Sequence, residues 1–327
     1  MSKTTKPNIG RLREILRRQD PPGWNKDYIP AILAERAEAP PKSRFARVWS
    51  PVFHRHIHVL SGVELAVLFI ILYYPRLFEL QEQRMLAMEP RPHPLEGHPA
   101  VSVEDLPLLQ GTVAVASRIG CLDFHPTIYV PDELEELIPA PFPWIGDFLL
   151  FLFDEAGHYC VNLTVKDDHE DFGCSTIKEQ PVRNPEKDEG KTKARHAIEE
   201  IYYRDANIPT IRIVKKDLPK KLIGNLRRIY LSFCKPVNVH DDIRKRFLDR
   251  LQGSLLTEVP PLEAFLSMKL QFDIPIPVQK ILMEQAIWRR ELRVELFGDP
   301  ILPDQPLLPE KRDVVKEFAH WFIRGKT

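Results

Sequence analysis

The chain has 327 residues, of which 43% are hydrophobic, and a length of this order allows two domains, one of them with a sizeable core. Its 46 lysines and arginines balance 46 aspartates and glutamates, which excludes a histone-like protein that holds nucleic acid by bulk positive charge. The 31 prolines are scattered without a repeat and exclude collagen-like and low-complexity classes.

The charge is distributed unevenly along the chain. Residues 1–60 have a net charge of +7, residues 95–171 of −13, and residues 178–230 of +6. An acidic centre between two basic segments fits a metal-binding site with borders that bind a polyanion. Ordinary solvated helix faces explain the same distribution, and charge alone leaves both interpretations open.

The sequence predicts a soluble protein of a reducing compartment. Its N-terminus lacks the apolar core of a signal peptide. The most apolar stretch, from Val63 to Tyr74, contains a glutamate and is shorter than the ~20 residues of a bilayer span, so it predicts a buried helix. Four widely spaced cysteines give no CxxC pair and no disulfide framework, namely Cys121, Cys160, Cys174 and Cys234.

The N-terminal third predicts a basic arm followed by a helix and a strand. Residues 1–45 are punctuated by prolines, and we expect helices at 9–18 and 31–39 within this arm. The apolar helix begins after Ser61 and ends at Pro75, and residues 77–83 alternate like a strand. A loop at 89–108, a short strand at 112–117 and a long loop rich in proline and acids are expected to follow.

The clearest local pattern is a β-hairpin. Two apolar runs, Asp147–Phe153 and His158–Lys166, flank a short turn that ends in Gly157. This turn places Phe153 opposite His158 and therefore Asp147 opposite Thr164, with Lys166 on the diagonal. Cross-strand neighbours of this kind lie ~5–8 Å apart. A carboxylate and an amine are thus expected next to each other, beside a polar strand face made by Asn162, Thr164 and Lys166.

The remaining chain predicts a mixed α/β core and a helical C-terminal domain. After a charged loop at 167–192, we expect a helix at 193–206, a strand at 209–214 and a helix at 219–233. Neither a dinucleotide-binding nor a P-loop motif is present. Three helices and a hairpin turning at residues 298–300 then predict a winged-helix-like domain over 235–327. The predicted helices are 241–251, 262–269 and 278–290.

Metal-dependent cleavage of a phosphodiester needs the residue types found in the hairpin. Two acids hold one or two Mg²⁺ ions, and a nearby lysine activates or orients the attacking water. An upstream acid followed by D-x(n)-[D/E/Q]-x-K is the pattern of restriction-endonuclease-like enzymes, and here it corresponds to Glu64, Asp147, Thr164 and Lys166. Structural roles also remain open, because Ser61 and Glu64 form a capping-box pattern and Asp147 and Lys166 stand at strand ends.

The segment 47–86 resembles the start of the nuclease domain of the TnsA family, the endonuclease subunits of bacterial transposons. In that family a histidine and a serine precede the helix with the catalytic glutamate, and an E-Q pair, a D-F-L triplet and a V-K pair follow. The same order occurs here in His58, Ser61, Glu64, Glu82, Gln83, Asp147, Phe148, Leu149, Val165 and Lys166. The similarity extends over about residues 45–232.

The resemblance implies a restriction-endonuclease-like nuclease domain over residues 46–234 that depends on Mg²⁺ or Mn²⁺. Glu64, Asp147 and the third position, Thr164, correspond to the metal ligands, although the family usually has Gln or Glu at that third position. Lys166 corresponds to the water-activating base or electrostatic element. Supporting or phosphate-contacting roles are implied for His58, Gln83 and Asn162.

The resemblance also implies a substrate and partners. The family cuts double-stranded DNA at the 5′ ends of a transposon, while a DDE-type transposase similar to TnsB cuts the 3′ ends. An AAA+ regulator similar to TnsC would bind the C-terminal domain. We expect such a protein in a bacterial cytoplasm, associated with the nucleoid when assembled and with no membrane partner.

Other interpretations stay open. Thr164 has a poor metal-binding side chain, and it motivates the alternative of a non-catalytic DNA-binding or assembly subunit on a degenerate nuclease fold. A transcription regulator built on the C-terminal domain is a third hypothesis, although residues 235–327 show no obviously basic recognition helix. His54, His56 and His58 alternate and could share a strand face as zinc ligands, but no cysteine or acid lies near them in the sequence.

Overall fold

The computed structural model describes residues 7–41, 43–101, 105–131, 135–172 and 185–325. Part of the expected loop at 167–192, with Cys174, lies outside these residues. The chain contacts divide into two compact units. The first comprises Met1–Leu65, Arg76–Asp217 and Trp321–Thr327, and the second comprises Ala66–Pro75 and Leu218–His320. The protein is mixed α/β, as the sequence predicts.

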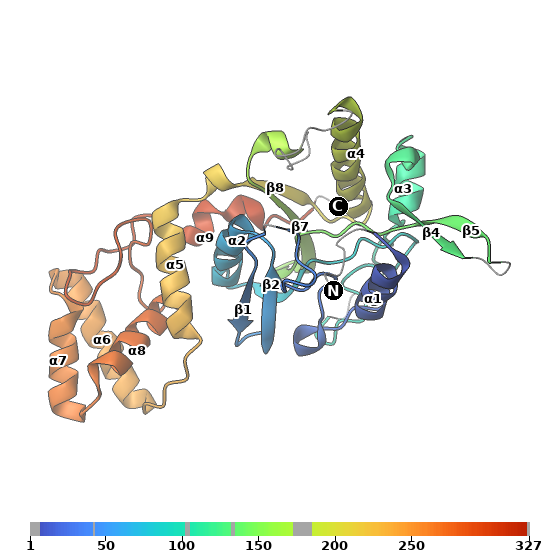
Figure 1. Cartoon of the computed structure of the whole chain (residues 1–327). Helices are drawn as coiled ribbons and strands as arrows, with labels where there is room; N and C mark the ends of the chain where they lie inside the picture. Colours follow the sequence, from blue (N-terminus) through green and yellow to red (C-terminus); the bar gives the residue numbers. More distant parts are fainter. Residues whose placement is uncertain (1–6, 42, 102–104, 132–134, 173–184, 326–327) are drawn as a thin grey trace. The chain divides into compact units, whose positions relative to one another are not determined.

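A mixed four-stranded sheet forms the centre of the first unit (Figure 1). Its strand order is β3-β6-β7-β8, in which β7 and β8 are parallel and the other neighbours are antiparallel. The strands are β3 (Leu77–Glu82), β6 (Phe148–Asp154), β7 (Gly157–Lys166) and β8 (Thr210–Val214). Phe153 pairs with His158, so the predicted hairpin register is confirmed.

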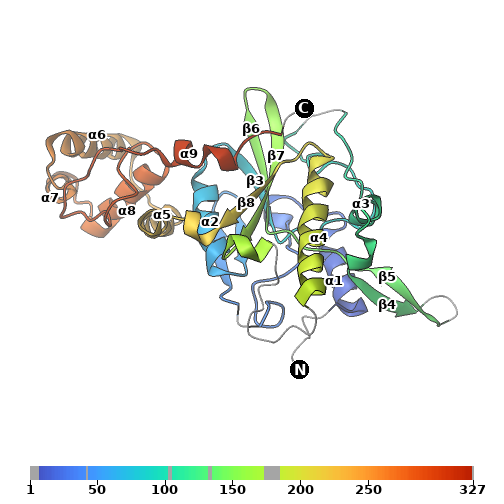
Figure 2. The same ribbon diagram turned by 90° about the horizontal axis from the view of Figure 1, so that it is seen from above.

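Two helices cover one face of this sheet, α3 (Thr112–Arg118) and α4 (Pro185–Arg204) (Figure 2). Their apolar side chains and those of the sheet form a common core, with members such as Val115, Phe151, Cys160, Ile198 and Tyr202. The strand predicted at 112–117 is wrong. The alternating valines and alanines of this segment fold as a helix because Val115 and Ala116 are buried in the core, and tertiary packing overrides β-propensity.

The N-terminal residues pack within the first unit. Helix α1 (Ile9–Gln19) agrees with the predicted helix at 9–18. The helix predicted at 31–39 is wrong, because this segment contains bends and turns. Its polar groups bond to distant residues instead: the Ala31 N–H donates to Gln83, and the Glu38 carboxylate accepts from the buried Arg18 guanidinium.

The structure contains two further pairs of antiparallel strands, of which the sequence predicted one only in part and the other not at all. Strand β1 (Ala46–Ser50) pairs with β2 (Arg55–Val59), of which only the second lies in the alternating stretch of the sequence. Strands β4 (Thr127–Pro131) and β5 (Leu137–Pro141) form a hairpin inside the expected long loop, and this hairpin extends beyond α3 (Figure 1). Short 3₁₀ turns lie at 25–27, 122–124, 169–172, 215–217 and 319–321.

Helices make up the second unit. It contains α5 (Lys220–Phe233), α6 (Asp241–Thr257), α7 (Pro261–Phe272), α8 (Ile276–Trp288) and the short α9 (Val314–Glu317). Helix α2 (Gly62–Tyr73) starts in the first unit and continues into the second, where Tyr73 lies edge-on to Trp288. The helices predicted at 241–251, 262–269 and 278–290 are confirmed, with longer ends for the first two. No helix in the described residues is both long and apolar enough to cross a membrane.

The predicted wing-like hairpin around residues 298–300 is wrong. Within the described part of the second unit, residues 292–309 form no β-strand, and a single bridge joins Val294 to Pro309. The physical reason is the proline content of the returning segment. Pro300, Pro303, Pro306 and Pro309 each lack the N–H that a ladder needs.

A buried ion pair ties β2 to β3. The Arg55 guanidinium contacts the Glu82 carboxylate at 2.7 Å and lies 4.8 Å from the ring centre of Tyr28. The side chain of Glu82 has no exposed surface, and that of Arg55 is 6% exposed. Removing one partner would leave the other as an uncompensated buried charge.

We therefore expect Arg55→Ala to lower the free energy of unfolding by roughly 3–5 kcal/mol, the usual loss when a buried pair is broken. Urea denaturation followed by circular dichroism measures this loss. Arg76→Ala is the matched control, because Arg76 pairs with Glu155 at the surface, where such pairs contribute little. Equal losses in the two variants would contradict the structural role of the Arg55–Glu82 pair.

Candidate functional site

A cavity of about 260 Å³ lies at the end of β7 in the first unit. It brings together the three residues predicted to be catalytic, Glu64, Asp147 and Lys166, and one predicted supporting residue, Gln83. Glu64 is on α2, Gln83 directly follows β3, Asp147 directly precedes β6, and Lys166 ends β7. Residues far apart in the sequence thus face one another in a small polar cavity.

Glu64 is held by the local structure at the start of α2. The Glu64 N–H donates to the Ser61 hydroxyl at 3.1 Å, which is the N-cap contact expected from the sequence. The Glu64 carboxylate accepts two hydrogen bonds, from the Leu60 N–H at 2.8 Å and from the Gln83 amide at 3.0 Å. Glu64 therefore both takes part in the N-cap of α2 and lines the cavity. Glu64 is buried, with 7% of its surface exposed.

Backbone contacts fix Asp147 between two strands. Its carboxylate accepts from the Val165 N–H at 2.7 Å, and its carbonyl accepts from the Gln83 N–H at 3.0 Å. Gln83 has a left-handed backbone (φ 48°), so the chain turns there while its side chain reaches Glu64. The bond from Val165 agrees with the expected cross-strand register, in which Asp147 lies beside residues 164–166.

The cavity concentrates negative charge. Burial raises the pKa of the Glu64 carboxyl well above its usual range, and the neighbouring Asp147 carboxylate raises it further. Hydrogen bonds with Leu60 and Ser61 and the positive charge of Lys166 lower the pKa of Glu64, but they offset only part of the rise. Two carboxylates that repel each other at the edge of a sheet favour binding of a cation.

Glu199 is a buried acid beside this site that the sequence did not single out. It lies on α4 with 2% of its surface exposed. Its Oε1 accepts from the Thr164 hydroxyl and from the Asn162 amide, each at 3.1 Å. Burial raises the pKa of Glu199, and the Asp147 charge raises it too. The sequence does contain a signal for the burial of Glu199, because it lies between Ile198 and Tyr202 on the apolar side of the helix.

Three of the predicted residues do not line the cavity. Thr164 and Asn162 are buried and bonded to Glu199, so the Thr164 hydroxyl is already engaged as a donor. His58 accepts from the Ala34 N–H at 2.9 Å through Nδ1. Burial lowers the pKa of His58 to about 4, so its imidazole is neutral at pH 7. The structure therefore separates these residues from the group formed by Glu64, Gln83, Asp147 and Lys166.

The donor set suits a hard divalent cation that keeps part of its hydration. Within the part of the chain that the structure describes, no three His, Cys, Asp or Glu side chains form a ready cluster for a metal. Mg²⁺ usually binds through one or two carboxylates, with waters and substrate phosphates as further ligands. Glu64 and Asp147 supply two such carboxylates in one cavity, so the residues fit this cation. They lack the His and Cys ligands typical of zinc.

Neither a protein-family model nor a curated protein matches the sequence. The chemistry of the site follows from its own residues: the acids Glu64 and Asp147, with Asp167 beside them, the Gln83 amide and the Lys166 amine lie around one cavity. This combination can hold a cation, accept a proton and place positive charge near an oxyanion.

The raised pKa of Glu64 predicts how stability depends on pH. The folded state keeps the Glu64 proton at pH values where the unfolded chain has already lost it, so this group's contribution to stability falls as pH rises above ~4.3, the value of an unperturbed glutamate. Asp147→Asn removes one cause of the shift and can still accept from Val165. We expect it to raise the melting temperature more at about pH 8 than at about pH 5, measured by calorimetry.

Asp154→Asn is the control for this comparison, because Asp154 pairs with Arg324 at the other end of the hairpin and its pKa is lowered rather than raised. Adding Mg²⁺ should stabilise the wild-type protein more than Asp147→Asn, since binding to the folded state shifts the equilibrium. The same melting temperature change at both pH values would contradict repulsion between Glu64 and Asp147.

Proposed function

We propose that this protein is a Mg²⁺-dependent DNA endonuclease. The observation that carries the proposal is the cavity in which Glu64, Gln83, Asp147 and Lys166 meet. These residues come from separate segments of the chain, and two acids with a lysine are the side chains that metal-dependent phosphodiester hydrolysis requires. The mixed sheet with a helix across one face is compatible with a restriction-endonuclease-like core.

Each residue of the cavity has a distinct part in this chemistry. Glu64 and Asp147 would hold Mg²⁺ (or Mn²⁺), which when bound polarises the scissile phosphate and stabilises the leaving oxygen. Lys166 orients the attacking water and places positive charge near the oxygen on which negative charge develops. Val165 and Leu60 fix the two carboxylates through their N–H groups, and the Gln83 amide fixes Glu64 further. The acids are therefore oriented before the substrate arrives.

Glu199 holds residues near the end of β7. It accepts hydrogen bonds from Thr164 and Asn162, and the Asp147 charge raises the pKa of Glu199. The TnsA family usually has Gln or Glu at the position that Thr164 occupies here. We propose that a carboxylate from α4 takes over part of that role here, as a positioning group next to the catalytic acids.

For the substrate, we propose the 5′ ends of a transposon. The order of residues from His58 to Lys166 is similar to that of the TnsA family, and the cavity contains the acids and the lysine of that order. A formal net charge of zero fits an enzyme that obtains much of its DNA affinity from partners. The proposed partners are a DDE-type transposase similar to TnsB and an AAA+ regulator similar to TnsC, the latter bound by the helical region 235–327.

A non-catalytic assembly subunit is the second candidate function. It is favoured by Thr164, whose hydroxyl donates to Glu199 and whose side chain lies outside the lining of the cavity. Such a protein would support assembly of the transposase on DNA, but it would cut no strand in the presence of Mg²⁺.

Substitution of the cavity residues tests catalysis. Asp147→Ala and Lys166→Ala are each expected to lower the rate of 5′-end cleavage by roughly 10²–10⁴-fold, the usual effect of removing a group that acts on proton transfer or transition-state charge. The measurement is strand-specific cleavage in a reconstituted excision assay with Mg²⁺ and the two partners. Glu155→Gln, in the turn of the same hairpin, should cleave like the wild type.

Wild-type rates in the Asp147→Ala and Lys166→Ala proteins would refute the assignment of the site. If the wild-type protein assembles with its partners but cuts nothing, the non-catalytic alternative is correct. Cleavage that persists after removal of Mg²⁺ and Mn²⁺ with a chelator would contradict the metal dependence.

Glu199→Gln tests the positioning role. Gln can still accept from Thr164 and Asn162, so we expect an unchanged melting temperature and a cleavage rate lower by roughly 10–100-fold, as for groups that orient metal ligands. The affinity for Mg²⁺, measured by calorimetry, should fall by a similar factor. Glu155→Gln, a strongly exposed acid in the turn between β6 and β7, is the control. A variant that loses stability but keeps its cleavage rate would show that Glu199 is purely structural.

A further inference from the structure

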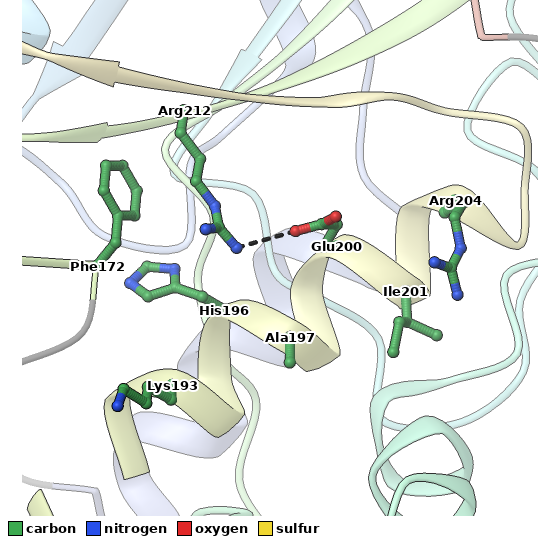
Figure 3. A pocket seen from close by; sticks show the side chains of 8 residues that line it. All are labelled: Phe172, Lys193, His196, Ala197, Glu200, Ile201, Arg204 and Arg212. Carbon is green, nitrogen blue, oxygen red and sulfur yellow. Dashed lines mark hydrogen bonds and ion pairs between the residues drawn. The ribbon is translucent and has the colours of Figure 1, made fainter. Parts of the chain in front are cut away.

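A second concave surface, of about 340 Å³, lies along α4 in the first unit (Figure 3). Among the described residues that line it are three cations, Lys193 and Arg204 on α4 and Arg212 on β8, and one acid, Glu200. Lys193 also forms an ion pair with Glu189 one turn earlier on α4. His196 lies between Lys193 and Arg212, and Phe172 lies beside Arg212. We call this surface the α4 groove. It has an excess of positive charge although the chain as a whole is neutral.

The cations of the groove follow one side of the helix. Lys193 and Arg204 are eleven positions apart, which is close to three helical turns, so they lie on the same face and ~16 Å apart along the axis. Measured along the axis of a duplex, this distance corresponds to about five base-pair steps at ~3.4 Å each. Both side chains are exposed. A polyanion that runs along α4 can therefore contact both.

Arg212 is held in place at the middle of the groove. Its guanidinium lies over the Phe172 ring, 5.4 Å from the ring centre, and donates to Glu200 at 2.9 Å. Figure 3 shows this bond and the approach of Arg212 toward α4 from β8. A guanidinium fixed by an aromatic ring and a carboxylate presents its remaining N–H groups in a defined direction, as recognition of phosphate oxygens requires.

His196 provides an independent sign of a ligand. It lines the groove and is 4% exposed, and its Nε2 has no hydrogen-bond partner among the described residues. Buried polar atoms are nearly always paired, so an unpaired one in a groove points to a missing partner. Burial lowers the pKa of His196 to about 3, so the neutral ring can offer a single N–H.

We propose that the α4 groove binds the phosphate backbone of the DNA strand on which the enzyme acts. Lys193 and Arg204 contact successive parts of the backbone, and Arg212 and His196 donate to one phosphate between them. The inference rests on the proposed function, since DNA is its ligand. The groove adjoins the positioning acid Glu199 through α4, because His196 Nδ1 lies 3.9 Å from the Glu199 carboxylate.

The test measures binding without cleavage. A short fluorescent duplex is titrated with the full chain in the presence of a chelator, at several salt concentrations. Lys193→Gln/Arg204→Gln should weaken binding and reduce the slope of log K against log salt by about two, one for each lost phosphate contact. Arg17→Gln/Arg76→Gln is the matched control, because it removes two charges from exposed ion pairs of the same unit.

A second measurement follows the imidazole of His196 by NMR. Its ring resonances should shift when the duplex is added, whereas those of His125, which is buried and has partners on both nitrogens, should not. The proposal is overturned if the wild-type protein shows no salt-dependent binding, or if the groove variant keeps the wild-type slope. It is also overturned if an acidic peptide of equal charge binds with the same dependence on Lys193 and Arg204.

Failure of this inference and failure of the proposed function give different results. Asp147→Ala should lose cleavage but keep the wild-type slope of log K against log salt, because Asp147 is outside the groove lining and removes no positive charge from it. If Asp147→Ala binds and also cleaves normally, the groove stands and the catalytic assignment fails. If the groove variant binds normally while Asp147→Ala is inactive, the catalytic assignment stands and the groove proposal fails.

Discussion

The Asp147 carboxylate and the Val165 N–H form the hydrogen bond on which the rest of the candidate site depends. This contact is 2.7 Å long and joins the residue before β6 to the end of β7. The carbonyl of the same residue accepts from the N–H of Gln83, which brings the end of β3 to the same place. Gln83 in turn bonds to Glu64. One aspartate thus connects three strands to the N-terminus of α2.

Burial makes this arrangement electrostatically costly. Glu64 and Glu199 are both almost fully buried, and the Asp147 charge raises the pKa of each. Acids that are held close together repel each other, and a bound cation would relieve this repulsion. Carboxyl groups with strongly perturbed pKa values are typical of functional sites.

Local patterns predicted the hairpin and its register, and hence that Asp147 and Lys166 lie near each other, because a short turn fixes cross-strand neighbours within a few residues. The failures depend on distant contacts. Residues 31–39 look helical but bond to Gln83 and Arg18, and residues 112–117 look like a strand but pack on α4 as a helix. Glu199 is the corresponding omission in the site, since its partners Thr164 and Asn162 lie more than thirty positions away.

The charge distribution along the sequence has two explanations, solvated helix faces or a metal site bordered by surfaces that bind a polyanion. The positions of the side chains show which explanation applies to which residue. Several bases between residues 178 and 230 do lie on solvated surfaces, as Lys216 does in its exposed pair with Asp168. Lys193, Arg204 and Arg212 are exposed as well, but they share one groove with a buried histidine nitrogen that has no partner among the described residues. In the acidic centre, Asp147 contributes to the cavity while Asp154 pairs with Arg324. Local placement, rather than the sum of charges, decides where this neutral chain can meet a polyanion.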